Sequence, residues 1–438
     1  MTGADLELEQ QYPVDFGEFV RKAGGYGRLV VQPRMGFGDP ARMRHGLLAT
    51  KAADATTVGT VTLDSYTRVG ELRAVEAALR AGRDLNGYPV VSHPTGTTGA
   101  VLSGVRDSGF PVQVRHGSAA PVDIFRALVR LRLNASEGGP VSYCLPYGRT
   151  PLAESVHNWK VCCELFARLR DAGAEPHLET FGGCMMGQLC PPGQLVAISV
   201  LEALFFAQHG IHSLSLSYAQ QTNREQDREA VAALRRLSAE LLPTDNWHVV
   251  VYAYMGVFPE SYRGAHRLLG QAAELAVVTG SERLIVKTVS EARRIPTVAE
   301  NVHALEYAAR KASRTRYEPG PDLSRDSRTY LEARALVEAV LGLDDDVGEA
   351  LIAAFRRGYL DVPYCLHPDN AGATRSYIDA EGKLQWADTG ALPLGAAAEN
   401  SGVARKVTSA GLLADLFHMR RTYDEPSNDV RELAVGAD

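Results

Sequence analysis

The stretch PVQVRHGSAAPVDIFRALVRLRLNASEGGPVSYCLPY, residues 111–147, decides the fold. It begins with the apolar segment PVQV, continues as an amphipathic helix (PVDIFRALVRLRL), and returns to an apolar segment, VSYCL. A short apolar run, a helix and a second short apolar run are typical of a βαβ unit, in which the two strands lie parallel in one sheet. Both apolar segments lie close to polar residues, which places polar side chains near the strand ends.

The same alternation extends through most of the chain and predicts a closed (β/α)8 barrel. Right-handed crossovers between strands that are apolar on both faces suit a parallel sheet covered by helices. A doubly wound open sheet is the alternative, but no GxGxxG follows the first strand. Nine segments are candidates for eight strand positions, so one must be wrong or lie outside the barrel: RLVV (28–31), VGTVTL (58–63), YPVV (88–91), PVQV (111–114), VSYCL (141–145), HLETF (177–181), SLSLSY (213–218), WHVVVYAY (247–254) and RLIVKT (283–288).

The pattern divides the chain into three parts. Residues 1–27 are expected to form an acidic lead-in with one short helix, and residues 28–317 the barrel. Residues 318–438 are expected to form a smaller C-terminal α+β appendage, with helices near 327–342 and 346–358 before an irregular segment rich in Pro, Gly and Asn.

Composition and charge exclude several classes of protein. The chain has 438 residues, of which 45% are hydrophobic and 22% charged, as in globular proteins with a large core. A net charge of −6 makes nucleic acid an unexpected partner. No apolar run approaches the roughly 20 residues needed to span a bilayer, and the acidic amino terminus lacks a signal-peptide pattern, so a soluble cytoplasmic protein is expected. The six cysteines include no CxxC pair, which predicts reduced thiols and no metal centre.

Three arginines stand at similar places in this pattern. Arg34, Arg68 and Arg115 each follow a predicted strand. Active sites of (β/α)8 enzymes lie at the carboxyl ends of the strands. A guanidinium group binds a carboxylate through two parallel hydrogen bonds, so the trio predicts a site for a small dicarboxylate. The alternative for each arginine is an ion pair with a neighbouring acid, such as Asp64.

Glu137, Tyr143 and Tyr147 are expected at the same rim. The glycines after Glu137 allow close backbone approach, and its carboxylate could hold an ammonium group or act as a general base. A turn carboxylate that faces solvent is the alternative. The tyrosines could donate hydrogen bonds to a ligand or belong to the barrel core, and His116 is expected to be a structural histidine.

Lys287 ends the strand RLIVK, and Glu291 follows four residues later. The amine could form a Schiff base with a carbonyl substrate, or it could hydrogen-bond a ribose or phosphate. The alternative is an ion pair with Glu291 across one helical turn, which contributes only about 0.2–0.5 kcal/mol.

Eight segments, in this order, resemble the larger (epsilon) subunit of adenosylcobalamin-dependent glutamate mutase, also called methylaspartate mutase. They run from about residue 28 to 310, with weaker similarity at DVPY (361–364). The segments are QPRMG (32–36), TLDSYTR (62–68), AGRDLNGYP (81–89), VQVRHG (112–117), SEGGPVSYCLPY (136–147), PPGQLVAISVLEAL (191–204), MGVFP (255–259) and LIVKTVSEARRIPT (284–297).

The resemblance implies roles for individual residues. Arg34, Arg68 and Arg115 would hold the two carboxylates of glutamate, and Glu137 its amino group, in a pocket that Tyr143 and Tyr147 complete. The contacts that it implies for adenosylcobalamin are Gly36, Asn86, Pro146, Phe258, Lys287, Glu291 and Ile295, of which Lys287 and Glu291 would face the adenosyl ribose.

The resemblance also implies a reaction and a partner. The reaction is a radical carbon-skeleton rearrangement of L-glutamate to (2S,3S)-3-methylaspartate. The cobalamin-binding signature DxHxxG is absent from this chain, which fits a barrel that receives its cobalamin from a separate small subunit, in a heterotetramer built on a dimer of large subunits.

Other functions remain open at this point. One is a mutase of a related amino acid in a biosynthetic pathway. Another is a cofactor-free aldolase or lyase that uses Lys287. The third is a catalytically silent barrel that binds a dicarboxylate or a partner protein.

Overall fold

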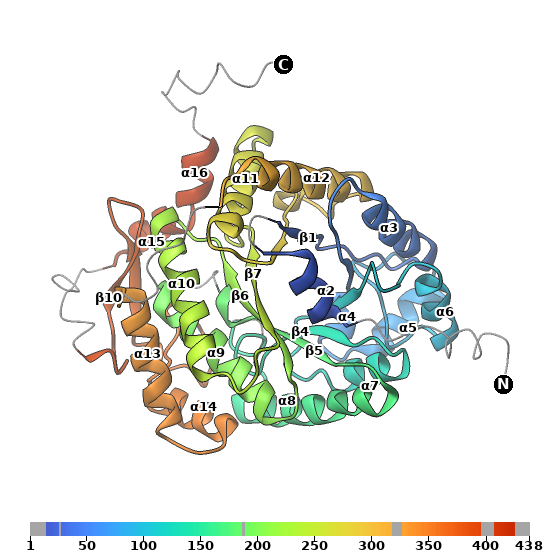
Figure 1. Ribbon diagram of the computed structural model, residues 1–438. Helices are drawn as coiled ribbons and strands as arrows, with labels where there is room; N and C mark the ends of the chain where they lie inside the picture. Colours follow the sequence, from blue (N-terminus) through green and yellow to red (C-terminus); the bar gives the residue numbers. More distant parts are fainter. Residues whose placement is uncertain are drawn as a thin grey trace.

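Eight parallel strands form a barrel with helices around it (Figure 1). The computed structural model describes residues 15–25, 28–146, 148–185, 189–317, 326–395 and 407–424. The strands follow one another in the order β1-β8-β7-β6-β5-β4-β3-β2. They are β1 (Val30–Gln32), β2 (Gly59–Thr62), β3 (Val112–Arg115), β4 (Ala135–Gly138), β5 (His177–Thr180), β6 (Ser213–Ala219), β7 (Trp247–Tyr252) and β8 (Arg283–Ile285). The predicted (β/α)8 fold is confirmed.

The barrel closes between its first two strands. A parallel bridge joins Val31 to Thr57, and the Val31 N–H donates to the Thr56 carbonyl at 2.9 Å. Inside the barrel, Gln32 Nε2 donates to Thr60 Oγ1 at 2.9 Å.

Helices connect successive strands and cover the outside of the barrel (Figure 1). Where the chain has an apolar face at helical spacing, the expected helix forms. The helices between the strands and after β8 are α3 (Pro40–Ala52), α4 (Ser65–Arg68), α5 (Leu72–Arg80), α6 (Thr95–Leu102), α7 (Val122–Arg130), α8 (Leu152–Ala167), η1 (Arg168–Ala172), η2 (Gly182–Cys184), α9 (Pro192–Gln208), α10 (Arg224–Leu241), α11 (Tyr262–Val278), η4 (Val289–Ala292) and α12 (Val298–Arg314).

Helix α2 (Phe16–Ala23) covers the amino ends of the strands. The Phe16 ring lies 5.0 Å from the ring of His177, the first residue of β5, and 5.0 Å from the guanidinium of Arg283, the first residue of β8. The lead-in helix therefore closes one end of the barrel and leaves the carboxyl ends of the strands for a site.

Two of the nine expected strands are wrong, and one real strand was missed. The segment YPVV contains a proline and contributes only a single bridge, between Tyr88 and Leu63. The segment VSYCL forms successive turns, with the Cys144 and Leu145 N–H groups donating to the Val141 carbonyl. Strand β4 instead has the sequence ASEG, which contains no β-branched residue, so its propensity does not indicate a strand.

The segment after α12 packs beside the barrel. Helix α13 (Arg328–Leu341) lies against α9 and α10, and α14 (Val347–Arg356) lies against α8 and α9 (Figure 1). The later elements are the antiparallel pair β9 (Arg375–Ile378) and β10 (Leu384–Asp388), and helices α15 (Ser409–Leu416) and α16 (His418–Asp424). In the irregular segment between α14 and β9, the buried carboxylate of Asp361 accepts the N–H groups of Gly372, Ala373 and Thr374.

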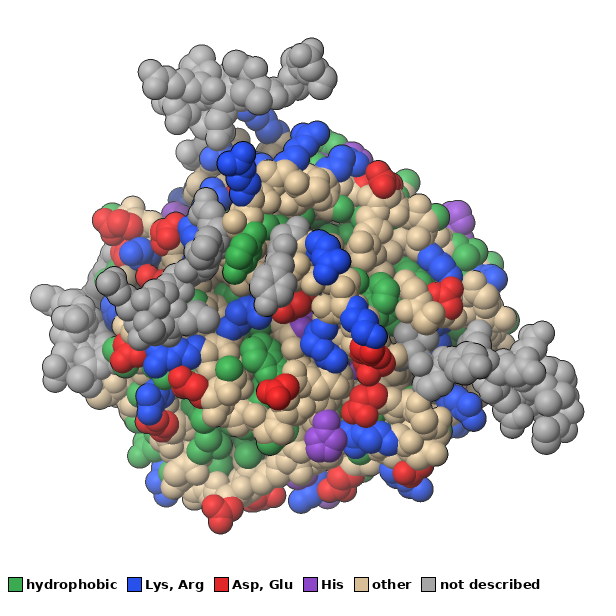
Figure 2. Space-filling model, in the orientation of Figure 1, with side chains coloured by type: hydrophobic (Ala, Val, Ile, Leu, Met, Phe, Trp, Pro, Cys, Tyr) green, Lys and Arg blue, Asp and Glu red, His purple; other side chains and the backbone are tan. Residues whose placement is uncertain are grey.

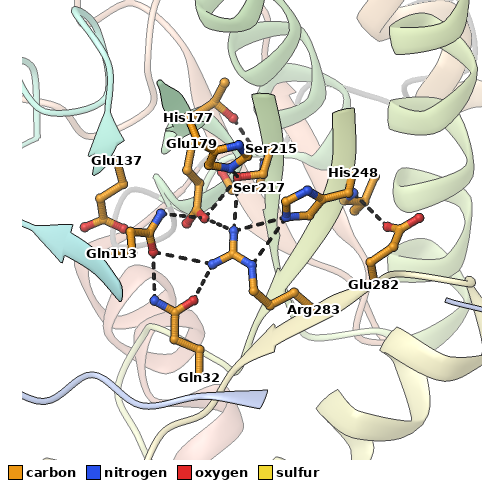
Figure 3. Close-up of polar contacts among 12 residues, drawn as sticks. Gln32, Gln113, Glu137, His177, Glu179, Ser215, Ser217, His248, Glu282 and Arg283 are labelled. Atoms are coloured by element: carbon orange, nitrogen blue, oxygen red, sulfur yellow. Dashed lines mark hydrogen bonds and ion pairs between the residues drawn. The ribbon is translucent and has the colours of Figure 1, made fainter. Parts of the chain in front are cut away.

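Polar side chains fill the interior of the barrel, where branched aliphatic residues are usual (Figure 3). Arg283 and Glu179 form an ion pair in which neither side chain is exposed. Arg283 also donates to Gln32 Oε1 and, at 3.0 Å, to Ser215 Oγ. Gln113 donates to Glu179 Oε2 at 3.1 Å. Each buried charge thus has an opposite charge and further hydrogen bonds, which is the condition under which buried charges are tolerated.

Two histidines complete this interior layer. His177 and His248 stack with ring centroids 5.3 Å apart, and His177 contacts the hydroxyls of Ser213 and Ser215 at 2.9 and 3.0 Å. Burial lowers the pKa of both histidines well below its ordinary value, and the charge of Arg283 lowers it further. Both rings are therefore neutral, and Arg283 remains the cation of this layer.

The outer surface carries mixed charge. On the face shown in Figure 2, Lys and Arg side chains are interspersed with Asp and Glu. Of the helices in the described part of the chain, none combines the length and apolar character needed to cross a membrane. All six cysteines are free and buried.

Replacing Arg283 with Met tests the interior ion pair. The variant should lose about 3–5 kcal/mol of unfolding free energy, because it leaves the Glu179 carboxylate buried without its cation. Adding Glu179→Gln should restore part of the loss. Urea denaturation measures both, with Arg334→Met as the control, since Arg334 pairs with Glu338 on an exposed helix face. Equal shifts for Arg283→Met and the control would contradict the role given to the pair.

Candidate active site

A cavity of about 900 Å³ opens at the carboxyl ends of the barrel strands. It gathers residues that lie far apart in the sequence, and most of the predicted site residues line it. Those residues are Arg34, Gly36, Arg68, Asn86, Arg115, Glu137, Tyr143, Lys287, Glu291 and Ile295. Tyr147 lies outside the described residues.

Arg115 and Glu137 form a buried ion pair at the inner end of this cavity. Arg115 is the last residue of β3, and its Nε donates to Glu137 Oε2, on the neighbouring strand β4, at 2.7 Å. Burial opposes the charge of Arg115, but Glu137, Tyr252 and Tyr143 together outweigh burial and raise the pKa of Arg115 well above its ordinary value. The alternative of a solvent-facing Glu137 is wrong, because this side chain is only 2% exposed.

Two phenols also hold the Glu137 carboxylate. The Tyr143 hydroxyl donates to Oε1, and the Tyr252 hydroxyl donates to Oε2 at 2.8 Å. The Tyr252 hydroxyl also contacts Oε1 of Glu179, so it joins the site to the interior ion pair. Glu137 is therefore fixed by groups from three sides and presents its charge at a defined place.

Arg34 and Glu291 form a second pair at the opposite wall. Arg34 follows β1, and its Nη1 lies 3.0 Å from Glu291 Oε2. Glu291 Oε1 accepts the Thr288 N–H at 2.9 Å, which caps the short helix η4. Arg34 thus pairs with an acid, but this acid lies 257 positions away in the sequence and is not the neighbouring acid that the alternative named.

Lys287 is the buried amine of the cavity. It makes no ion pair with any residue that the structure describes, since Glu291 is engaged by Arg34. Its Nζ lies 4.5 Å from the centroid of the Phe258 ring. Burial lowers its pKa to about 8; Glu291 opposes this shift and Arg34 adds to it. The alternative, an ion pair between Lys287 and Glu291, is therefore wrong.

Arg68 lacks an acid partner among the described residues. It is the last residue of α4, and Asp64 caps that helix by accepting the Thr67 N–H at 2.9 Å and the Thr67 hydroxyl. The alternative in which Asp64 pairs with Arg68 is therefore wrong. The buried Nε atoms of Arg68 and Arg34 meet no hydrogen-bond partner in the described structure. Such atoms at a cavity wall favour an anionic or hydroxyl-bearing ligand.

His116 borders the cavity as a neutral ring. Burial, together with Arg68 and Arg115, lowers its pKa to about 3. Its Nδ1 accepts the Ser118 N–H at 3.1 Å, and its ring packs against Tyr143 and Trp159. These contacts fit the structural role expected for His116, although its buried Nε2 meets no hydrogen-bond partner among the described residues.

The remaining residues implied as cofactor contacts differ in position. Ile295 is 52% exposed at the rim. Asn86 accepts the Ser65 N–H at 2.9 Å. At Gly36 a Cβ atom would lie 2.1 Å from the Thr62 carbonyl oxygen, so close packing of two backbones requires this glycine. Pro146 and Phe258 do not line the cavity, although Phe258 contacts Lys287.

Sequence reasoning missed Tyr252 and Phe181. Tyr252 is the last residue of β7 and contacts Glu137, whereas Phe181 follows β5 and lines the cavity. The signal for Tyr252 was its place in WHVVVYAY, where His248, Val250 and Tyr252 share one face of the strand. Two polar residues on that face indicate a polar barrel interior.

Comparison with known proteins places the chain in a family. The family model described as methylaspartate mutase E chain (MutE) matches residues 13–410. A glutamate mutase epsilon subunit of Escherichia coli O157:H7 is 28% identical over 419 residues, covering 90% of this chain and 86% of the relative. Glutamate mutase epsilon subunits of Haloarcula marismortui and Halobacterium salinarum are 32% and 30% identical, covering 74% and 76% of this chain and 68% and 71% of the relatives. The chain therefore belongs to the methylaspartate mutase E chain family, a family of isomerases.

Proposed function

We propose that this chain is the barrel subunit of an adenosylcobalamin-dependent glutamate mutase, which rearranges L-glutamate to (2S,3S)-3-methylaspartate. It acts with a separate small subunit that binds cobalamin, in a heterotetramer built on a dimer of barrel subunits. One observation carries this proposal. In the cavity of a barrel of this family, Arg68, which has no acid partner among the described residues, lies beside the buried pair of Arg115 and Glu137.

The charges of the cavity suit an amino dicarboxylate. Arg68, Arg34 and Arg115 offer guanidinium groups to two carboxylates, and Glu137 offers a fixed carboxylate to one ammonium group. Because Arg115 and Glu137 already lie 2.7 Å apart, the carboxylate and ammonium of one α-amino acid head group can each meet its opposite charge there. Tyr143 and Tyr252 hold Glu137 in this position.

The cavity also fits part of a larger cofactor. Its volume of about 900 Å³ is near the upper end of the roughly 300–1,000 Å³ usual for small-molecule sites. The buried Lys287 amine and the unpartnered Nε of Arg34 lie at the wall where a ribose hydroxyl would find donors. Adenosylcobalamin bound in this cavity would supply the radical chemistry of the rearrangement.

The protein residues bind and shield the substrate during the rearrangement. Arginines on several strand ends fix both carboxylates, so the substrate keeps its orientation while its glycyl fragment migrates. The barrel wall, closed below by the buried layer around Arg283, excludes water from a reactive intermediate. Lys287 and Glu291 would contact the ribose of the adenosyl group.

Reconstitution tests the proposed function directly. The chain is mixed with a small cobalamin-binding subunit and adenosylcobalamin, and conversion of L-glutamate to 3-methylaspartate is measured with each component omitted in turn. Activity should require all three. If a cob(II)alamin radical signal appeared only with a different amino acid, the proposed substrate would be replaced by that amino acid. The absence of both signal and product would overturn the proposal.

Arg68→Lys tests the carboxylate site. Lysine keeps the charge but loses the planar fork, so KM for glutamate should rise roughly tenfold or more, which corresponds to the loss of a charge-assisted hydrogen bond. The control is Arg293→Lys, since Arg293 lines the same cavity but is exposed and pairs with Glu260 at 3.4 Å. The same KM for both variants would contradict a role for Arg68 in binding.

The lowered pKa of Lys287 favours one other function, an aldolase or lyase that uses a Schiff base. With a pKa of about 8, roughly a tenth of the amine is neutral at pH 7 and able to attack a carbonyl. Borohydride treatment with a keto acid should give no adduct at Lys287 if the chain is a mutase subunit. An adduct in the native chain, absent in Lys287→Arg, would favour the aldolase or lyase.

A further inference from the structure

A buried carboxylate outside the cavity holds the loop that carries Tyr143. Glu202 lies on α9, and its side chain is completely buried. Its Oε1 accepts the N–H groups of Val141 and Ser142 at 3.2 and 2.8 Å. Its Oε2 accepts the Ser142 hydroxyl at 3.0 Å.

The same carboxylate also binds a second loop. Its Oε2 accepts the N–H groups of Phe181 and Gly182 at 3.3 and 2.9 Å. Glu202 thus joins the loop after β4 to the loop after β5, and both loops line the cavity, through Tyr143 and Phe181. The rings of these two residues lie 4.9 Å apart.

Two glycines bring the first loop this close. A Cβ atom at Gly139 would lie 2.0 Å from Glu202 Oε1, so no side chain fits there. Gly138 has φ +135°, and a Cβ atom on it would lie 2.4 Å from the Trp159 ring. The backbone path between Glu137 and Tyr143 therefore depends on contact with the Glu202 carboxylate.

Within the described structure, no cation pairs with Glu202, and its carboxyl oxygens are held by peptide N–H groups and one hydroxyl. Burial raises the pKa of Glu202 to about 7, and the hydrogen bonds from Ser142, Phe181 and Gly182 oppose this shift. A buried carboxylate without a cation is costly, but an apolar residue at this place would leave four buried N–H groups and one hydroxyl without an acceptor. The two oxygens of the carboxylate orient N–H donors from two separate loops and thereby fix the position of each loop. The Tyr143 hydroxyl at the end of one loop donates to Glu137.

We propose that Glu202 is a positioning residue for the reaction: it holds the loops after β4 and β5 together, so that Tyr143 stays on the Glu137 carboxylate and the ammonium group of the substrate meets a fixed charge. This inference rests on the proposed function, because it assigns Glu137 to the substrate. It adds a residue on the outer helix layer, which does not touch the cavity itself.

Glu202→Gln is the variant that tests this role, because an amide NH2 would face peptide N–H groups. Asp227→Asn is the matched control. Asp227 is equally buried and accepts the Tyr218 hydroxyl at 2.8 Å and the Gln221 N–H at 3.0 Å, but these residues do not line the catalytic cavity. Ser142→Ala is a milder second variant, which keeps the carboxylate and removes one donor.

Hydrogen exchange of the free chain is the first measurement, and it needs neither cofactor nor activity. The amides to follow are those of Val141, Ser142, Phe181 and Gly182. Glu202→Gln should speed their exchange at least about tenfold, the effect of losing one hydrogen bond to a charged group, and Ser142→Ala should speed it to a smaller extent. The control should leave the exchange of these amides unchanged. Unchanged exchange in Glu202→Gln would overturn the proposal.

A double-mutant cycle on the reconstituted enzyme is the second measurement. If Glu202 acts through Tyr143, Glu202→Gln and Tyr143→Phe should each lower kcat, and the double variant should fall little below the lower single variant. In the Asp227→Asn background, Tyr143→Phe should keep its full effect. If the kcat losses of Glu202→Gln and Tyr143→Phe multiplied in the double variant, the inference would be overturned. An inactive wild-type mixture with the expected exchange result would overturn the proposed function and leave the loop anchor supported.

Discussion

The ion pair between Arg283 and Glu179 is the interaction on which the rest of this barrel depends. Neither side chain is exposed, and a charge in such a place is stable only beside its opposite. Glutamines from β1 and β3 and a serine from β6 complete the hydrogen bonds, so five strands are tied to one centre (Figure 3). The register of these strands is thereby coupled, because a shift of one residue would turn a charge toward the helices.

The same pair leads to the site above it. Glu179 contacts the Tyr252 hydroxyl, which in turn donates to Glu137, the partner of Arg115. Two cations and two carboxylates therefore stand in one connected column and balance each other. The pair of Arg115 and Glu137 borders the cavity, where the carboxylate and the ammonium group of a zwitterion can pair with Arg115 and Glu137 in turn. Arg68, unpaired among the described residues, then supplies positive charge that the column does not neutralise.

Much of the fold follows from the sequence, because the spacing of apolar residues indicates helices with one apolar face and strands of branched residues. The predictions failed where local propensity and tertiary contact disagreed. YPVV and VSYCL look like strands, but a proline interrupts the first and the Glu202 carboxylate draws the second into turns. The four residues of β4 form a strand through pairing with β5, for example Glu137 with Glu179, and not through their own preference.

The sequence by itself determined which chemistry this chain can offer. Arginines and a lysine stand at the ends of strands whose carboxyl ends must meet, because parallel strands joined by helices share one direction. The sequence also offered Glu137, which it placed just before a predicted strand and which lies in β4. The structure brings Arg34, Arg68, Arg115, Glu137 and Lys287 to one cavity. Only the tertiary structure decided the partners. Arg34 pairs with Glu291, and Asp64 caps a helix, so that neither Lys287 nor Arg68 has an acid partner in the described part of the chain. Ion pairing depends on distances of a few ångströms between segments as far as 257 positions apart, and spacing along the chain does not contain those distances.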